Sequence, residues 1–247
     1  MAGETIGVVT DPGSSLSPEA AAKKGVLLLD PERPFDEQYR RYLGFYDKLL
    51  SLHASPRLCP MYERAKSAAE TIANQRVRAI NTRLGSAGLG SAALRAASLL
   101  NGGKSEDEAL AEVRRLADQG RFLLLSRDLR RLVENGLLPG FAGKIGAALR
   151  LWALISLENE TFLTSPLPLA QGRVLQAVTA QLSKHFTTRA IAVRAVFGDV
   201  SADIHEGLKK ELGKKLHLHS GTLAPMDAVA RGRVGDHSLA VFAYPVG

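Results

Sequence analysis

The segment Ile6-Gly7-Val8-Val9-Thr10-Asp11 decides how the first half of the chain is organised. It is rich in β-branched residues and apolar up to the aspartate, which is typical of a buried strand. A helix should follow, because Ser17 is suited to an N-cap with Pro18 at the first helical position, and Gly25 ends the pattern. A buried strand followed directly by a helix is the repeating unit of a parallel α/β layer.

The same alternation continues outward from this segment. Short apolar runs predict strands at 26–29, 49–54, 77–80 and 122–125, and helical spacing predicts helices at 35–47, 62–74, 88–100 and 105–119. Ser105 and Glu108 form the Ser-x-x-Glu capping box of the last of these helices. We therefore predict a mostly parallel α/β domain over residues 1–138.

The pattern changes after residues 135–140, which are rich in glycine and leucine and contain a proline. Beyond them the sequence predicts a hairpin of strands at 153–157 and 161–164, helices at 173–184 and 201–212, and further strands at 190–197 and 239–244. Strands joined by a short hairpin are antiparallel. We therefore predict a C-terminal α+β domain over residues 139–247, with a mixed sheet that is partly antiparallel.

Composition narrows the class of protein. The 247 residues are 45% hydrophobic and 23% charged, as in an ordinary soluble protein, and no apolar run approaches the roughly 20 residues of a membrane span. The first residues lack the basic and apolar parts of a secretory signal. A single cysteine, Cys59, forms no internal disulfide. We expect a cytoplasmic protein.

The net charge of +7 suits an anionic partner or a carboxylate ligand. The basic residues occur as scattered doublets without interleaved aromatic side chains, so nucleic-acid binding is not expected. Residues 102–105 resemble the end of a phosphate-binding loop, but Ser98 stands where its first glycine is needed. The capping box at Ser105 explains this segment instead.

Three further motifs each have two interpretations. Asp11 lies at the carboxyl end of a predicted strand and is either a nucleophile or, as we favour, a cap or partner contact. The glycines of 85–90 either bind an anion or, as we favour, permit close packing. His217 and His219 could share one strand face and hold a metal, but no third ligand is evident, and a surface strand or loop is preferred. We expect no metal and no cofactor.

Taken together, several segments resemble the DegV family of bacterial fatty-acid-binding proteins. Residues 6–16 resemble the opening strand of the family with its Thr-Asp-Ser signature, and 51–58 resemble its Ser-Ser-x-Leu-Ser-Gly-Thr turn. The small-residue helix start of the family is similar to 86–90. Further similarities follow in family order at 103–105, 129–136, 157–159 and 234–242.

The resemblance implies an N-terminal parallel α/β domain, a C-terminal α+β domain, and a long-chain fatty acid in a tunnel between them. It also implies that the chain is not itself an enzyme, but presents the carboxyl group of the lipid to the catalytic subunit of an ATP-dependent fatty acid kinase. Burial of about fifteen methylenes at roughly 0.8 kcal/mol each contributes on the order of 12 kcal/mol before ordering costs.

The lipid-binding residues implied by the resemblance are Pro31, Ser55, Cys59, Gly88 and Arg233. Three of them depart from the family: Pro31 stands at a threonine position, Cys59 at a serine position, and Arg233 at a histidine position. Two interpretations stay open. Either Arg233 binds the carboxylate with its forked guanidinium, or the chain is a divergent interaction module that has lost fatty-acid binding.

Overall fold

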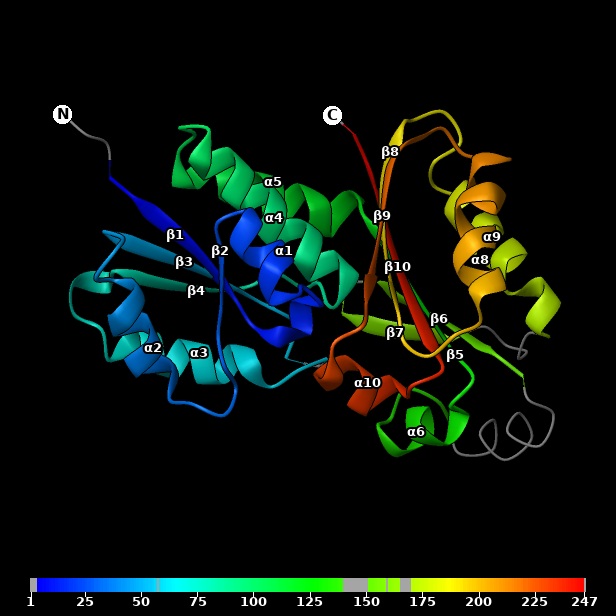
Figure 1. The fold of residues 1–247 in the computed structure, drawn as a ribbon, viewed down its shortest axis with the longest axis horizontal. Coiled ribbons are helices and arrows are strands. Elements are labelled where there is room, and N and C mark those ends of the chain that lie inside the picture. Colours follow the sequence, from blue (N-terminus) through cyan, green and yellow to red (C-terminus); the bar gives the residue numbers. More distant parts are fainter. Residues whose placement is uncertain (1–3, 57, 140–150, 159, 165–169, 247) are drawn as a thin grey trace. The chain divides into compact units, whose positions relative to one another are not determined.

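A computed structural model describes residues 4–56, 58–139, 151–158, 160–164 and 170–246 of the chain. They belong to two compact units, Met1–Asp118 and Gln119–Gly247. Figure 1 shows the ribbon coloured along the sequence. Each unit is built on its own sheet, so each is described by itself.

The first unit contains a four-stranded sheet, sheet A, in which every neighbouring pair of strands is parallel. The strands are β1 (Ile6–Thr10), β2 (Val26–Leu28), β3 (Lys48–His53) and β4 (Val77–Asn81). Their order is β2-β1-β3-β4, so β2 and β3 lie on opposite sides of β1. The predicted parallel α/β architecture of the N-terminal part is confirmed.

Helices cover both faces of sheet A. They are α1 (Pro18–Lys23), α2 (Phe35–Tyr42), α3 (Met61–Glu70), α4 (Ala87–Asn101) and α5 (Glu106–Gln119), with short 3-10 turns η1 (Pro12–Ser14) and η2 (Ala73–Gln75). Figure 1 shows α2 and α3 on one face and α1, α4 and α5 on the other. Phe35, Tyr39 and Ala65 bury the α2 and α3 side against Val9 and Leu49 of the sheet.

Local sequence signals explain where these helices begin and end. The Ser17 hydroxyl accepts a 3.2 Å bond from the amide of Ala20, as an N-cap does. Ser105 and Glu108 form both bonds of the predicted capping box, at 2.9 and 3.2 Å. Helix α2 ends before residue 47 because the amide of Asp47 already bonds to the carbonyl of Thr5 beside the sheet.

The second unit contains a six-stranded mixed sheet, sheet B, in the order β7-β6-β5-β10-β8-β9. Its strands are β5 (Arg121–Ser126), β6 (Ala153–Glu158), β7 (Thr161–Thr164), β8 (Ile191–Phe197), β9 (Leu218–Pro225) and β10 (Ser238–Pro245). All neighbours are antiparallel except β8 and β9. The predicted hairpin of β6 and β7 and the mixed sheet are confirmed.

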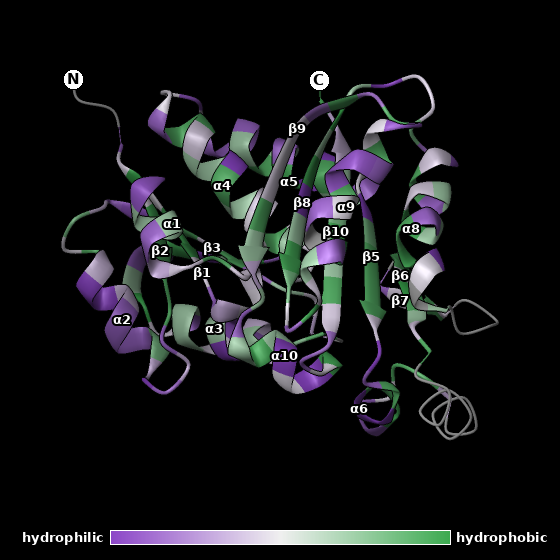
Figure 2. Ribbon diagram, turned by 45° about the vertical axis from the view of Figure 1, so that its right-hand side comes forward, coloured by the Kyte–Doolittle hydropathy of each residue, from purple (hydrophilic) through white to green (hydrophobic). Residues whose placement is uncertain are grey.

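Helices α8 (Val174–Ser183) and α9 (Ala202–Gly213) pack on one face of sheet B around a large apolar cluster. Figure 2 shows its central strands as predominantly hydrophobic. Two short helices, α6 (Leu129–Glu134) and α10 (Ala228–Val234), lie side by side at one end of this unit (Figure 1). The amide of the Asn135 side chain donates to the carbonyl of Arg233 and joins them.

The division between the units differs from the predicted boundary at 138/139. It falls between Asp118 and Gln119, because β5 pairs with β6 and β10 and not with any strand of sheet A. The break in the sequence at 135–140 instead follows α6, which contacts α10 within the second unit. Strand β5 therefore opens the second unit, although an apolar run carries no signal of the sheet that it will join.

Candidate functional site

The loops at the carboxyl ends of β1 and β3 form the candidate site of the first unit. The chain leaves β1 toward β2 on one side and returns to β3 on the other, so the winding direction changes between these two strands. In open parallel sheets, ligands bind outside the carboxyl ends of strands at such a switch point. The loops concerned are residues 11–15 and 54–59.

A buried chain of four polar side chains lies beneath these loops. The Asp11 carboxylate lies 2.7 Å from Nδ1 of His53, whose Nε2 lies 2.8 Å from the Ser51 hydroxyl. The Ser51 hydroxyl in turn lies 2.9 Å from the hydroxyl of Tyr39. None of the four is exposed. Sequence reasoning missed this chain, although Ser51 and His53 are two residues apart on one strand face, a spacing that indicates it.

The proton positions in this chain follow from chemistry. A carboxylate only accepts, so Nδ1 of His53 donates to Asp11, and in the neutral ring Nε2 accepts the hydrogen bond of Ser51. Ser51 then accepts from Tyr39, whose pKa is raised well above its ordinary value by burial. Aspartate, histidine and serine are also the members of a hydrolytic triad. Here, however, the Ser51 hydroxyl is buried and already donates its proton to His53, so it does not face a substrate.

The structure also confirms the predicted role of Asp11 as a cap. Its second oxygen accepts a 2.7 Å bond from the amide of Gly13 at the start of η1. Both carboxylate oxygens are therefore engaged inside the protein. This geometry favours the structural interpretation of Asp11 over a nucleophile, since an aspartyl nucleophile needs an oxygen that faces the substrate.

The loop after Asp11 contacts the start of α4. The carbonyl of Gly13 accepts a 2.8 Å bond from the amide of Ser86, and the hydroxyls of Ser15 and Ser86 lie 3.0 Å apart. Both serines have positive φ angles, of 50° and 45°, which are uncommon for residues other than glycine. The hydroxyl of the preceding residue, Ser14, is buried and has no hydrogen-bond partner among the described residues.

The structure brings Ser55 and Cys59 together in the loop after β3. The carbonyl of Ser55 accepts a 2.9 Å bond from the amide of Cys59, and both side chains are buried. Gly13 approaches them, since a Cβ at that position would lie 4.0 Å from Cys59 Sγ. Pro31 lies farther along the same edge, after β2, where its carbonyl accepts a bond from Arg64 of α3.

Gly88 lies in the first turn of α4 and is buried. Its amide donates to the carbonyl of Gly85, and the amide of Gly90 donates to that of Ser86. Gly85 itself packs against Leu58, where a Cβ would collide with the leucine side chain. These contacts support the predicted role of the glycines in close packing over anion binding.

Arg233 belongs to the second unit, at the end of α10, and is partly buried. Its carbonyl accepts a 3.1 Å bond from Asn135. The binding of a carboxylate by its guanidinium stays a prediction, as does the tunnel between the two domains.

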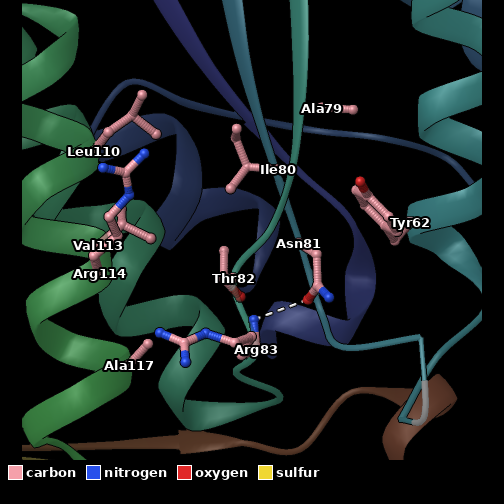
Figure 3. A pocket seen from close by; sticks show the side chains of 10 residues that line it. All are labelled: Tyr62, Ala79, Ile80, Asn81, Thr82, Arg83, Leu110, Val113, Arg114 and Ala117. Atoms are coloured by element: carbon pink, nitrogen blue, oxygen red, sulfur yellow. Dashed lines mark hydrogen bonds between the residues drawn. The ribbon is translucent and has the colours of Figure 1, made fainter.

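Figure 3 shows a pocket of about 360 Å³ on the outer side of edge strand β4. Ile80, Leu110 and Val113 give it apolar walls from β4 and α5. Its Arg83 is already engaged, since the amide donates to Asn81 (dashed in Figure 3) and the guanidinium pairs with Asp118. The pocket is at the lower end of the volume range of ligand sites and contains no buried polar atom without a partner among its described lining residues.

The described parts of the chain contain neither a candidate metal site nor a candidate membrane-spanning helix. No three His, Cys, Asp or Glu side chains there are grouped to hold an ion. His219 lies exposed on β9 and His217 just before it, in agreement with the preferred surface strand or loop. No described helix has the length and apolar character of a membrane span.

The chain is thus an α/β protein of two units, one built on a parallel sheet and the other on a mixed sheet covered by helices. The sequence model for uncharacterised proteins of the DegV family matches residues 31–246. The chain belongs to the DegV family.

Known relatives agree with this assignment. A DegV domain-containing protein of Deinococcus radiodurans is 32% identical over 123 residues, which are 49% of this chain and 43% of the relative. The match thus spans less than half the length of that relative.

Solved structures share the fold over nearly the whole chain. A DegV family protein from Thermus thermophilus, described by its fatty acid binding, has a TM-score of 0.85 at 22% identity, covering 98% of this chain and 100% of the other. One from Corynebacterium glutamicum has a TM-score of 0.87 at 15% identity, covering 99% and 98%. DegV of Bacillus subtilis, described as a fatty acid binding protein, has a TM-score of 0.76 at 17% identity, covering 99% and 100%.

Proposed function

We propose that this chain binds a long-chain fatty acid or a related lipid, with the carboxyl group of the ligand at the loops after β1 and β3. Membership of the DegV family supports the proposal, as do the descriptions of the Thermus and Bacillus proteins as fatty acid binding. We also propose that the chain is a carrier, not an enzyme by itself, and presents the carboxyl group to an ATP-dependent fatty acid kinase.

The observation that carries the proposal is the buried hydroxyl of Ser14. A buried hydroxyl without a partner destabilises the folded state by about 1 to 3 kcal/mol. A ligand carboxylate would accept its hydrogen bond and remove this cost. The thiol of Cys59 lies in the same loop cluster but is a weak donor, so Ser14 is the stronger neutral donor for the ligand.

Two substitutions separate a ligand role for Ser14 from a structural one. Ser14→Ala should weaken the binding of palmitate or oleate roughly tenfold and raise the stability of the free protein by about 1 to 3 kcal/mol, since it removes a buried hydroxyl that has no partner there. Ser17→Ala is the matched control. It removes the cap of α1, so it should lower stability by about 1 kcal/mol and leave affinity unchanged.

Arg233 is the proposed cationic contact of the carboxylate. Arg233→Ala should lower the affinity for a fatty acid by about 1.5 to 3 kcal/mol, the range for a hydrogen bond to a charged group. Arg130→Ala, on the exposed face of α6, is the control and should change nothing. Mass spectrometry of organic extracts from gently purified protein tests binding itself. The lack of any acyl species, with no uptake of added palmitate or oleate, would favour the interaction module.

A further inference from the structure

The second unit contains a polar pocket that the proposed lipid binding does not use. It has a volume of about 820 Å³ and lies between residues 127–134 and the turn from α10 to β10. Its volume is within the range of about 300 to 1,000 Å³ found for small-molecule sites.

A carboxylate and a histidine form one wall of this pocket. Asp128 accepts a 2.7 Å bond from the backbone amide of His237 and a 3.0 Å bond from its Nδ1. The close approach depends on Gly235, which has a φ of 91° and where a Cβ would collide with the Asp128 side chain. The His237 ring is thereby held in one orientation, and its Nε2 has no hydrogen-bond partner among the described residues.

The charges around the pocket do not balance. Arg130 pairs with Glu134 at 2.8 Å, and Arg231 faces Asp236 at 3.7 Å. Asp128 is engaged by His237. Arg127 and Arg131 also line the pocket, and neither guanidinium has an ion pair with any residue that the structure describes. The four arginines and three carboxylates of the lining leave a net charge of +1, and the guanidinium groups of Arg127 and Arg131 remain available to a ligand.

We propose that this pocket binds the phosphate group of a phosphomonoester. Such a group carries about −1.5 to −2 charges at pH 7 and offers acceptor oxygens to both arginines that lack an ion pair. A guanidinium donates two parallel hydrogen bonds to phosphate oxygens, whereas a carboxylate offers only one negative charge. The pocket is larger than free phosphate requires, so the ligand is an ester with a further organic part.

Isothermal titration calorimetry at low ionic strength tests the ligand class with three probes. Phenyl phosphate should bind at least tenfold more tightly than benzoate, which presents a carboxylate on the same ring, and more tightly than inorganic phosphate. Equal affinities for phenyl phosphate and inorganic phosphate would overturn the assignment of an ester. Equal affinities for phenyl phosphate and benzoate would overturn the assignment of a phosphate group.

Variants of the arginines test the location. Arg127→Gln and Arg131→Gln should each weaken phenyl phosphate binding about tenfold, while Lys214→Gln, which lies outside the pocket lining and pairs with Glu211, should change it less than twofold. An equal loss in all three variants, or none in the first two, would overturn the site. Palmitate binding measured on the same variants should not change, so this inference and the proposed lipid binding can fail separately.

Discussion

The two units each contain an aspartate that binds Nδ1 of a histidine, and the two pairs differ in what surrounds them. In the first unit Asp11 and His53 are 2.7 Å apart and neither is exposed. In the second, Asp128 and His237 are 3.0 Å apart and the side chains are 28% and 40% exposed. The first histidine also bonds through Nε2, whereas the second leaves that atom to the pocket.

This difference teaches how the same pair serves two purposes. When both ring nitrogens bond to protein atoms and the pair is fully buried, it fixes the backbone around it, here the loop of Gly13. When one nitrogen faces an open pocket lined by arginines, the pair instead presents a fixed ring to a ligand. Burial, and not the pairing, separates the structural pair from the binding pair.

The sharpest test removes each aspartate in turn. Asp11→Ala should lower the free energy of unfolding by about 3 to 5 kcal/mol, because it leaves a buried imidazole and the amide of Gly13 without their acceptor. Asp128→Ala should lower it by about 1 kcal/mol or less, since water replaces the lost bonds at an exposed pair. Urea denaturation followed by circular dichroism measures both.

Hydrogen exchange locates the first effect. In Asp11→Ala the amides of β1 and β3 should lose protection from exchange, because β1 ends at Thr10, next to Asp11, and β3 contains His53, its hydrogen-bond partner. Equal losses of stability for the two aspartate variants would contradict the distinction between the pairs.

The next test concerns the glycine that allows the exposed pair to form. Gly235→Ala should destabilise the second unit by about 1 to 3 kcal/mol from the backbone conformation alone, with a further loss from the collision with Asp128. Gly136→Ala is the matched control, since its φ is also positive at 70° but nothing lies within 4 Å of a Cβ there. Gly136→Ala should lower the free energy of unfolding by about 1 kcal/mol.

The fluorescence of Trp152 reports on this unit, because the only tryptophan of the chain is buried in its core. If both glycine variants unfold at the same urea concentration, the close approach of Gly235 to Asp128 contributes nothing.

The contrast between the pairs also shows what the sequence could and could not predict. The strand and helix of residues 6–23 follow from local signals, namely a β-branched run and the Ser17 cap, and the structure has both. The sequence does not distinguish a strand from a loop at β9, because β9 lies at an exposed edge and lacks the apolar alternation that marks a half-buried strand.

Contacts between distant residues could not be predicted for a different reason. The two residues of each pair, Asp11 with His53 and Asp128 with His237, meet only after the sheets have formed. They are far apart in the sequence, and no spacing rule links them. The choice of sheet for β5 depends in the same way on β10, the last strand of the chain. Family resemblance supplied the order of the segments but not these pairings.

A smaller effect is expected from the far end of the buried chain. Tyr39→Phe removes the hydroxyl that donates to Ser51 and should lower the free energy of unfolding by about 1 kcal/mol. Tyr42→Phe, in the same helix, removes a hydroxyl that donates to the carbonyl of Leu28 in a partly buried position, so its loss should be smaller. A larger loss for Tyr42→Phe would mean that the buried chain is not stabilising at this end.

The smallest effect is a dependence on alkaline pH. Burial raises the pKa of Tyr39 above its ordinary value of 10, so in this pH range the residue ionises in the unfolded chain and not in the folded one. Its contribution is complete below pH 10 and is lost as the pH rises. Between pH 9.5 and 10.5 the loss is about 0.7 kcal/mol by linkage. The free energy of unfolding should therefore fall more steeply in the wild type than in Tyr39→Phe, and identical slopes would show that Tyr39 ionises as readily in the folded protein.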